Sequence, residues 1–344
     1  MSVVRRPFGT TRGGQAVELL TLRCGAMEAE ILTFGATVRA LRVPDKSGSA
    51  VDVVLGYNSV AGYEKNDGYL GALVGRYANR IANARYEIDG KPVLLDANEG
   101  KKQLHGGSVG FSHRVFEAEV AGESSVKLRY TAADGEGGHP GQLTLCATYT
   151  LTENALILRY EAESDKPTYC NITNHSYFNL NGHGDILSHR LHIAASRFTP
   201  VDADSIPVAM AVPAANTAFD FTTEKPVGRD LFADEEQLRL THGYDHNFVL
   251  DAPQGLRYAA RLTGEESGIV METWTEKPGV QLYCGNFLDT NADTKTGTPY
   301  GKHDALCLET QFFPDSPNHG EWGDILLRPG QHYDYTTEYR FFTV

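Results

Sequence analysis

The chain has 344 residues, of which 22% are charged, and its formal net charge is −13. This acidic balance argues against nucleic acid or an anionic membrane as a partner, because neither is attracted to a negatively charged surface. The 35 glycines and 15 prolines indicate many turns, which favours short strands over long helices.

The N-terminus and the cysteines indicate where the protein works. The first ten residues, MSVVRRPFGT, are followed by TRGGQ rather than by the apolar core of a signal peptide. No segment reaches the roughly 20 apolar residues of a membrane span. The five cysteines form no CxxC pair that would indicate zinc or redox chemistry. We therefore expect a cytoplasmic protein whose thiols are buried and reduced.

Apolar and polar residues alternate over short stretches along most of the chain, as they do in strands with one buried face. Helical periodicity is limited to two short stretches, residues 59–66 and 233–240. In chain order, the predicted strands cover residues 16–22, 26–33, 36–43, 51–56, 125–130, 189–194, 281–286 and 333–342.

The clearest pattern lies at residues 143–160. Apolar side chains occupy every second position from Leu143 to Leu151, and the alternation resumes at Leu156 after the turn-like residues 153–154. Period two around a tight connection predicts an antiparallel hairpin. Because no linker, repeat or low-complexity tract interrupts the chain, we expect residues 1–344 to form one all-β domain. A large antiparallel β-sandwich or a barrel with little helix fits this pattern.

Five segments break the strand pattern because they concentrate polar and ionisable side chains. They are GRYANRI at 75–81, QLHGG at 103–107, TNHSYFNL at 173–180, YDHNF at 244–248 and LETQFFPDSPNH at 308–319. Taken singly, several have structural explanations: a turn at His105, a salt bridge at Arg80 and an Asx turn at Asp245. His175 and Glu309 differ, because they lie in apolar and aromatic stretches where an unpaired ionisable group is costly to bury. Either a satisfied buried network or a ligand pocket explains them.

The two histidines and two carboxylates of these segments are compatible with three kinds of chemistry. A metal site of two histidines and one carboxylate usually shows close spacing such as HxH or HExxH, and these segments contain none. Glycoside hydrolysis by Asp245 and Glu309 depends on a separation that the sequence leaves open. Proton transfer at the anomeric carbon of a sugar needs one base, one acid and groups that hold the hydroxyls.

Together, in this order and over most of the chain, the five segments resemble those of the aldose 1-epimerase (galactose mutarotase) family. The resemblance implies a large β-sandwich, called a supersandwich, with a sugar cleft on one open face. It also implies an isomerase that interconverts the α and β anomers of free hexoses such as galactose and glucose, with a monosaccharide as partner and no cofactor or metal. Monomer and homodimer both stay open, because exposed sheet edges are either blunted by loops or paired.

Carried over residue by residue, the resemblance assigns the chemistry to two side chains, Glu309 as general base and His175 as general acid. His105 resembles the second histidine, which bonds the sugar near its ring oxygen. The other side chains expected at the sugar are Asn79, Arg80, Tyr177, Asp245 and Gln281, of which Tyr177 fits a packing role equally well.

Two other functions on the same scaffold stay open. A sugar-phosphate 1-epimerase needs a cationic clamp for the dianion, and the motif segments offer only Arg76 and Arg80 for it. A non-catalytic sugar-binding protein would not require the expected acid and base, both of which are present.

Overall fold

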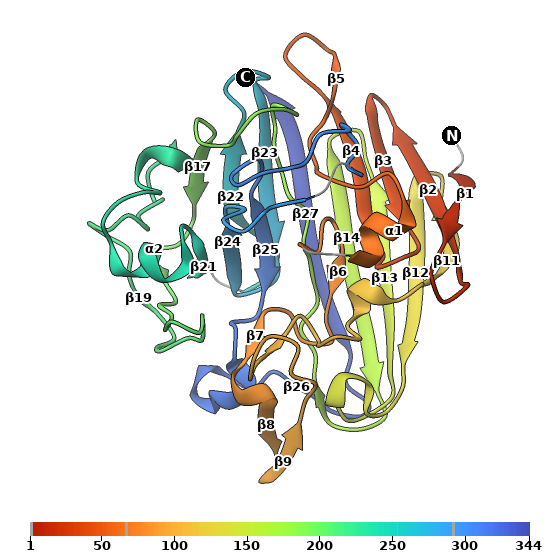
Figure 1. Ribbon diagram of the computed structural model, residues 1–344, viewed down its shortest axis with the longest axis vertical. Helices are drawn as coiled ribbons and strands as arrows, with labels where there is room; N and C mark the ends of the chain where they lie inside the picture. The colour runs from red at the N-terminus through yellow and green to blue at the C-terminus, as the bar shows by residue number, and fades with distance from the viewer. Residues whose placement is uncertain (1–2, 66–67, 253, 291–292) are drawn as a thin grey trace.

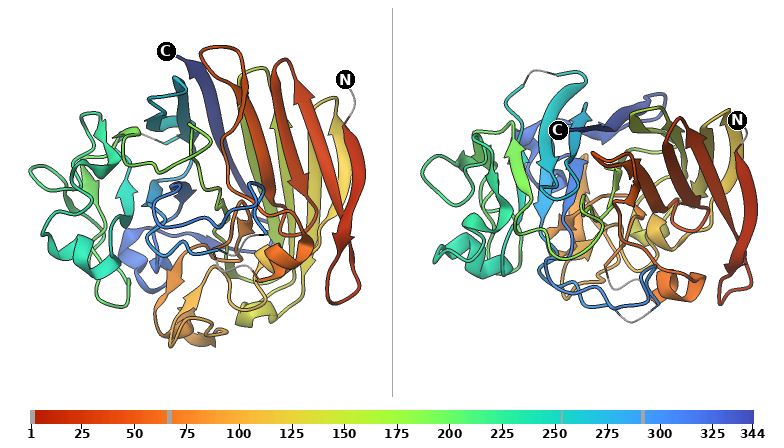
Figure 2. Two further views of the ribbon diagram at one scale, coloured as in Figure 1. Left: turned by 45° about the horizontal axis from the view of Figure 1, so that its top comes forward. Right: turned by 90° about the horizontal axis from the view of Figure 1, so that it is seen from above.

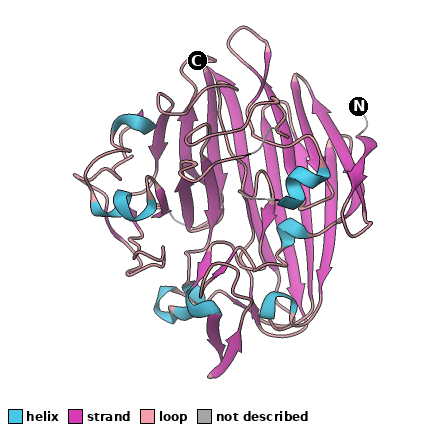
Figure 3. Ribbon diagram, viewed as in Figure 1, coloured by secondary structure: helices cyan, strands magenta, loops and turns pink. Residues whose placement is uncertain are grey.

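The computed structural model describes residues 3–65, 68–252, 254–290 and 293–344, and strands dominate it (Figure 3). One antiparallel sheet has nine strands and another has five. In spatial order, the nine-stranded sheet consists of β11 (Glu117–Gly122), β12 (Ser125–Ala132), β13 (Leu143–Leu151), β14 (Ala155–Ser164), β27 (Tyr333–Thr343), β23 (Ile269–Thr275), β22 (Arg257–Thr263), β17 (Arg190–Ile193) and β20 (Lys225–Pro226). The five-stranded sheet consists of β1 (Val4–Thr10), β2 (Ala16–Cys24), β3 (Met27–Leu32), β4 (Val38–Pro44) and β5 (Ala50–Asp52).

The two sheets pack face to face. Figure 1 shows β1 to β4 in front of β11 to β14, and Figure 2 shows the same two layers from above. Side chains of both sheets belong to one apolar core cluster, which includes Leu20, Tyr149 and Phe341. The Tyr149 hydroxyl also donates a 2.8 Å hydrogen bond to the Ala36 carbonyl oxygen, just before β4. The predicted all-β antiparallel sandwich is therefore confirmed.

The predicted hairpin at residues 143–160 is confirmed as β13 and β14. Its register pairs Leu143 with Ser164 and Leu151 with Leu156. Every second side chain of β13 is buried, and those between are half-buried. Because fully burying a leucine contributes roughly 1.5–3 kcal/mol relative to leaving it exposed, this alternation fixes which face meets the core.

The remaining predicted strands form, and two of them end three or more residues earlier than expected. The run at 51–56 leaves the ladder after β5, because the Leu41 N–H of β4 donates to the Asp52 side chain (Oδ1, 3.1 Å) and Leu55 N–H donates to Tyr177 O at 3.0 Å. The run at 281–286 ends at Tyr283. Both short helices also form, as α1 (Val60–Lys65) and α2 (Glu236–Thr241). Asn66, the last residue of the first predicted helix, lies outside the described residues.

A third sheet and four small ladders complete the fold. The third sheet is antiparallel and consists of β19 (Val212–Pro213), β18 (Arg197–Phe198), β21 (Asp245–Val249), β24 (Gly279–Tyr283) and β25 (Cys307–Gln311). The ladders pair β7 (Arg80–Ile81) with β10 (Gln103–Leu104), β6 (Leu73–Val74) with β16 (Thr173–Asn174), β8 (Arg85–Ile88) with β9 (Lys91–Leu94), and β15 (Thr168–Tyr169) with β26 (Leu326–Leu327). Short 3₁₀ turns lie at Ala82–Ala84, Phe111–His113, Glu136–Gly138, Val227–Arg229, Ser316–Asn318 and Gly320–Trp322.

The cysteines are all free thiols. Cys170, Cys284 and Cys307 are buried as predicted, whereas Cys24 and Cys146 are half-buried. Within the described residues, no helix has the length and apolarity to cross a membrane.

Candidate active site

Seven of the eight side chains predicted at the sugar line one cavity of about 260 Å³. They are Asn79, Arg80, His105, His175, Tyr177, Asp245 and Glu309. Gln281 does not line this cavity, but its Nε2 donates a 2.7 Å hydrogen bond to Asp245 Oδ1. Clefts for drug-sized ligands measure roughly 300–1,000 Å³, so a cavity of this size suits a smaller ligand such as one sugar ring.

The third sheet supplies the acidic wall of the cavity. Its register places Gln281 of β24 opposite Glu309 of β25, and Asp245 of β21 opposite Tyr283 of β24. Because side chains two residues apart on a strand share a face, all four point to the same side of the sheet. Every residue of β25 is buried. Glu309 is therefore carried on a wholly buried strand, and Asp245 lies at the half-buried start of β21.

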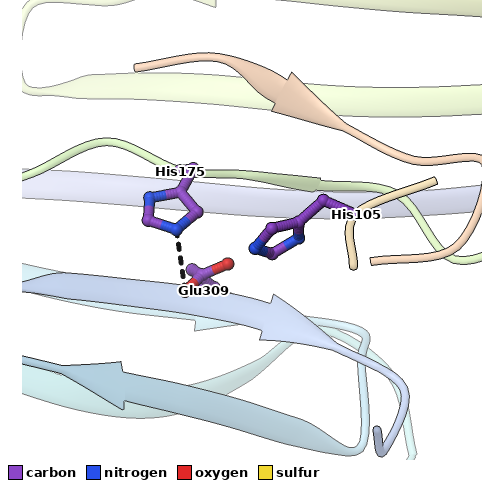
Figure 4. A group of neighbouring side chains, drawn as sticks. All are labelled: His105, His175 and Glu309. Atoms are coloured by element: carbon purple, nitrogen blue, oxygen red, sulfur yellow. Dashed lines mark ion pairs between the residues drawn. The ribbon is translucent and has the colours of Figure 1, made fainter. Parts of the chain in front are cut away.

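His175 reaches Glu309 from the opposite side (Figure 4). Phe178 and Leu306 exchange two backbone hydrogen bonds of 2.7 and 3.0 Å, which fix the segment at 173–180 against the start of β25. The His175 ring then lies with Nε2 at 3.7 Å from Glu309 Oε1. The Tyr177 ring stacks on the His175 ring at a centroid distance of 5.1 Å, so Tyr177 both lines the cavity and supports the histidine.

His105 is held by reciprocal bonds with Asn79. The His105 N–H donates to Asn79 O, and the Asn79 N–H donates to His105 Nδ1, each at 3.1 Å. Because Nδ1 accepts a hydrogen bond, the proton of the neutral ring must lie on Nε2. Both residues have left-handed backbones, with φ of 52° and 63°, a conformation that costs roughly 1–2 kcal/mol for a side chain with a Cβ. Gly106 follows with φ of 89°, and a Cβ there would lie 1.9 Å from the Gly75 oxygen.

Burial dominates the ionisation of these groups. It raises the pKa of Glu309 well above its usual value, with a further increase from Asp245 and an opposing effect of Arg80. It lowers the pKa of His175 to about 4, although the histidine's own backbone favours the charged form. It also lowers the pKa of His105 well below its usual value, and His175 and Arg80 add to this decrease. Burial therefore favours uncharged side chains at all three positions.

Residues 18–340 match the family described as aldose 1-epimerase. The chain belongs to the aldose 1-epimerase family. It is similar to the galactose mutarotase of Rattus norvegicus, at 42% identity over 99% of both chains. It is also similar to the aldose 1-epimerase of Escherichia coli K12, at 40% identity over 95% of this chain and 96% of that one. Among solved structures, it resembles the aldose epimerase homologue of C. elegans, with a TM-score of 0.87, 32% identity and full coverage of both chains. It is therefore an isomerase, the class to which aldose 1-epimerases belong.

The family's two histidines and glutamate also form a possible ligand set for a metal. His105, His175 and Glu309 each offer one ligand atom, and these atoms lie within 4.8 Å of one another. The sequence did not predict this grouping, because the three residues come from distant segments and form no closely spaced metal-binding motif. A histidine binds a metal through an unprotonated nitrogen, and in His105 the cavity-facing Nε2 carries the proton. The donor set thus does not fit a divalent cation, and His105 instead offers a hydrogen-bond donor.

Six further residues of the wall were not predicted from the sequence. They are Gly68, Tyr69, Glu99, Leu104, Tyr283 and Phe287. A signal existed for Tyr283, which lies two residues after Gln281 on a predicted strand and so shares its face. Cys307 was likewise missed as a contact of the histidine, with Sγ at 3.5 Å from His175 Nδ1.

Proposed function

We propose that this isomerase interconverts the α and β anomers of free hexoses such as galactose and glucose, with Glu309 as base and His175 as acid. The observation that carries the proposal is the unsatisfied carboxylate between two imidazoles. Glu309 Oε2 is buried without a hydrogen-bond partner among the described residues, while Oε1 faces His175 Nε2 at 3.7 Å. An anomeric hydroxyl that donates to Oε2 would satisfy it.

The reaction opens and recloses the sugar ring. Glu309 removes the proton of the anomeric hydroxyl, His175 donates a proton to the ring oxygen, and the bond between C1 and that oxygen breaks. The resulting aldehyde rotates about the C1–C2 bond and presents its other face to the hydroxyl. Both proton transfers then run backwards and restore Glu309 and His175. The sequence of steps consumes no electron, phosphate or cofactor.

Glu309 and His175 need only one exchangeable proton between them. Burial favours the uncharged form, in which the proton lies on Glu309. The reactive form, a carboxylate beside an imidazolium, contains the same number of protons. Hydroxyl groups of the sugar stabilise it by donating to the carboxylate, so binding rather than bulk pH supplies the charged pair.

The remaining cavity residues hold the sugar. Asp245 Oδ1 is occupied by Gln281, so Oδ2 is the oxygen that accepts from a sugar hydroxyl, and Arg80 Nη1 lies 3.8 Å from it as a donor. The protonated Nε2 of His105 donates toward the ring oxygen. Asn79 contributes by holding His105 in this orientation.

A phosphorylated sugar fits this cavity poorly. Arg76 is 2% exposed, does not line the cavity, and donates to the carbonyl oxygens of Pro140 and Gly141 at 2.7 and 2.9 Å. Arg80 is already paired with Glu99. With two carboxylates in the same wall, a dianion would meet repulsion rather than a cationic clamp.

Polarimetry tests the proposed function directly. Freshly dissolved α-D-galactose and α-D-glucose are followed with and without the purified, chelator-treated protein. We expect faster relaxation to an unchanged final rotation. A folded sample that leaves the rate of both sugars unchanged would contradict the proposal.

We also infer that the protein is cytoplasmic and that residues 1–344 act as one domain. The five unpaired thiols support the first inference, because an oxidising compartment favours disulfides. The continuous core cluster from Leu20 to Phe341 supports the second. A monomer or homodimer is proposed, and light scattering after gel filtration distinguishes them.

A further inference from the structure

Glu99 lines the cavity, yet the acid–base chemistry does not use it. Its carboxylate accepts two hydrogen bonds from Arg80. Arg80 Nε donates to Glu99 Oε2 at 2.7 Å, and Arg80 Nη2 donates to Glu99 Oε1 at 2.9 Å. Two parallel bonds of this kind fix the plane of a guanidinium group. The side chains of Arg80 and Glu99 are only 14% and 34% exposed, so solvent screens this pair less than a surface ion pair.

The free edge of Arg80 faces Asp245. Arg80 Nη1 lies 3.8 Å from Asp245 Oδ2, which is too far for a hydrogen bond. The other oxygen, Oδ1, accepts from Gln281. A donor and an acceptor thus lie side by side across a gap. One sugar hydroxyl fits this arrangement, since it can accept from Nη1 and donate to Oδ2.

Without Glu99, the far edge of the guanidinium would lose the carboxylate that balances the attraction of Asp245. Opposite charges at this distance attract strongly where solvent is partly excluded, enough to draw a flexible side chain into direct contact. Arg80 would then close the gap and neutralise the sugar-binding oxygen itself. Lys102 supports the observed arrangement, because its Nζ lies 3.6 Å from Glu99 Oε2 and donates to the Asp204 carbonyl oxygen at 2.6 Å.

We propose that Glu99 is a positioning residue that keeps Arg80 apart from Asp245, so that both groups stay open to a sugar hydroxyl. The inference rests on the proposed function for the identity of the ligand, a sugar. The way in which Glu99 acts rests on the geometry of Arg80. Glu99 acts through Arg80 and touches neither reacting atom.

The test is Glu99→Gln, which keeps the size of the side chain but leaves one acceptor oxygen. We expect KM for galactose to rise at least tenfold and kcat to stay within about threefold, because binding and not proton transfer is affected. Glu99→Asp, which retains the charge, should recover part of the lost affinity. Glu87→Gln is the matched control, since it removes an exposed ion pair with Arg85 outside the cavity and should leave both constants unchanged.

A double-mutant comparison shows whether Glu99 acts through Arg80. If it does, Arg80→Lys/Glu99→Gln should bind galactose no more weakly than Arg80→Lys alone. Additive losses, or an unchanged KM in Glu99→Gln, would overturn the proposal.

A measurement without sugar separates this inference from the proposed function. The Arg80 Nε–H proton should give a sharp, slowly exchanging NMR signal in the wild type and a broadened or absent one in Glu99→Gln. If the wild type fails to accelerate mutarotation, the proposed function fails, and this signal still decides whether Glu99 holds Arg80. An Arg80 signal that is identical in both proteins would overturn the positioning role.

Discussion

Replacing Asp245 by asparagine should move the alkaline limb of the pH–rate profile to lower pH. In the proposed mechanism, the pair of Glu309 and His175 shares one exchangeable proton, and the loss of that proton ends catalysis. The alkaline limb therefore follows the raised pKa of Glu309. Asp245 contributes to that increase, after burial, because a second negative charge nearby disfavours ionisation. The asparagine side chain would keep the shape of the aspartate and an acceptor for Gln281 while removing the charge.

The register of the third sheet gives the expected size of this pH shift. Asp245 pairs with Tyr283, and Glu309 pairs with Gln281, so the two carboxylates are carried on strands two positions apart. At about 4.8 Å per strand and about 3.4 Å per residue, two strand steps and a two-residue offset along β24 place them roughly 12 Å apart. At an effective dielectric constant of about 20, their repulsion is about 1.4 kcal/mol. Since 1.36 kcal/mol corresponds to one pH unit, the limb should move by about one unit.

Polarimetric measurements of kcat/KM across the pH range report the ionisation of the free enzyme. In the wild type, the acid limb is expected near pH 4, because burial lowers the pKa of His175 to about 4. Asp245→Asn should also raise KM roughly 10- to 150-fold, through loss of a charged hydrogen bond to the sugar worth about 1.5–3 kcal/mol. Asp334→Asn, which breaks an exposed ion pair with Arg159, is the control and should leave the profile unchanged. An alkaline limb in Asp245→Asn that stays in place or moves upward would refute the reasoning.

Three further outcomes test the site and its support. Glu309→Gln and His175→Gln should each lower kcat about 10²- to 10⁴-fold with little change in thermal melting, and a variant with near-wild-type turnover would contradict its assigned role. Gly106→Ala should lower the free energy of unfolding in urea by more than about 2 kcal/mol, from the left-handed backbone and the clash together, whereas Gly100→Ala, with open space around it, should lower it by only about 1–2 kcal/mol. Dialysis against EDTA should leave kcat unchanged because His105 presents a protonated nitrogen to the cavity, and activity restored only by added zinc would show that this protonation is misassigned.

The sequence predicted those parts of the fold in which each residue's environment repeats locally. β13 and β14 were recognisable because every second side chain meets the core, and a period of two survives without knowledge of the partner strand. The strand predicted at 51–56 was too long for the opposite reason. Leu55, in its later part, bonds to Tyr177, and no local pattern predicts so distant a partner.

The contrast between local patterns and distant contacts also explains which site residues could be predicted from the sequence. Motif resemblance located His175 and Glu309, but it could not locate Glu99, which lies in a loop without periodicity. Glu99 reaches Arg80 only because β10 pairs with β7 and places Leu104 opposite Arg80. The role of such a residue follows from the pairing of two short strands and not from its own neighbours in the chain.

The geometry also separates the roles of two buried imidazoles that the sequence alone could not distinguish. His105 Nδ1 accepts a backbone N–H, so a second proton on that ring would have to displace the Asn79 bond that fixes its position. His175 Nδ1 faces the Cys307 thiol at 3.5 Å, and a thiol can turn its hydrogen away and accept instead. The backbone of His175 favours its charged form as well. Of the two rings, only His175 can therefore cycle between one and two protons without disturbing its surroundings, which is what proton donation to the ring oxygen requires.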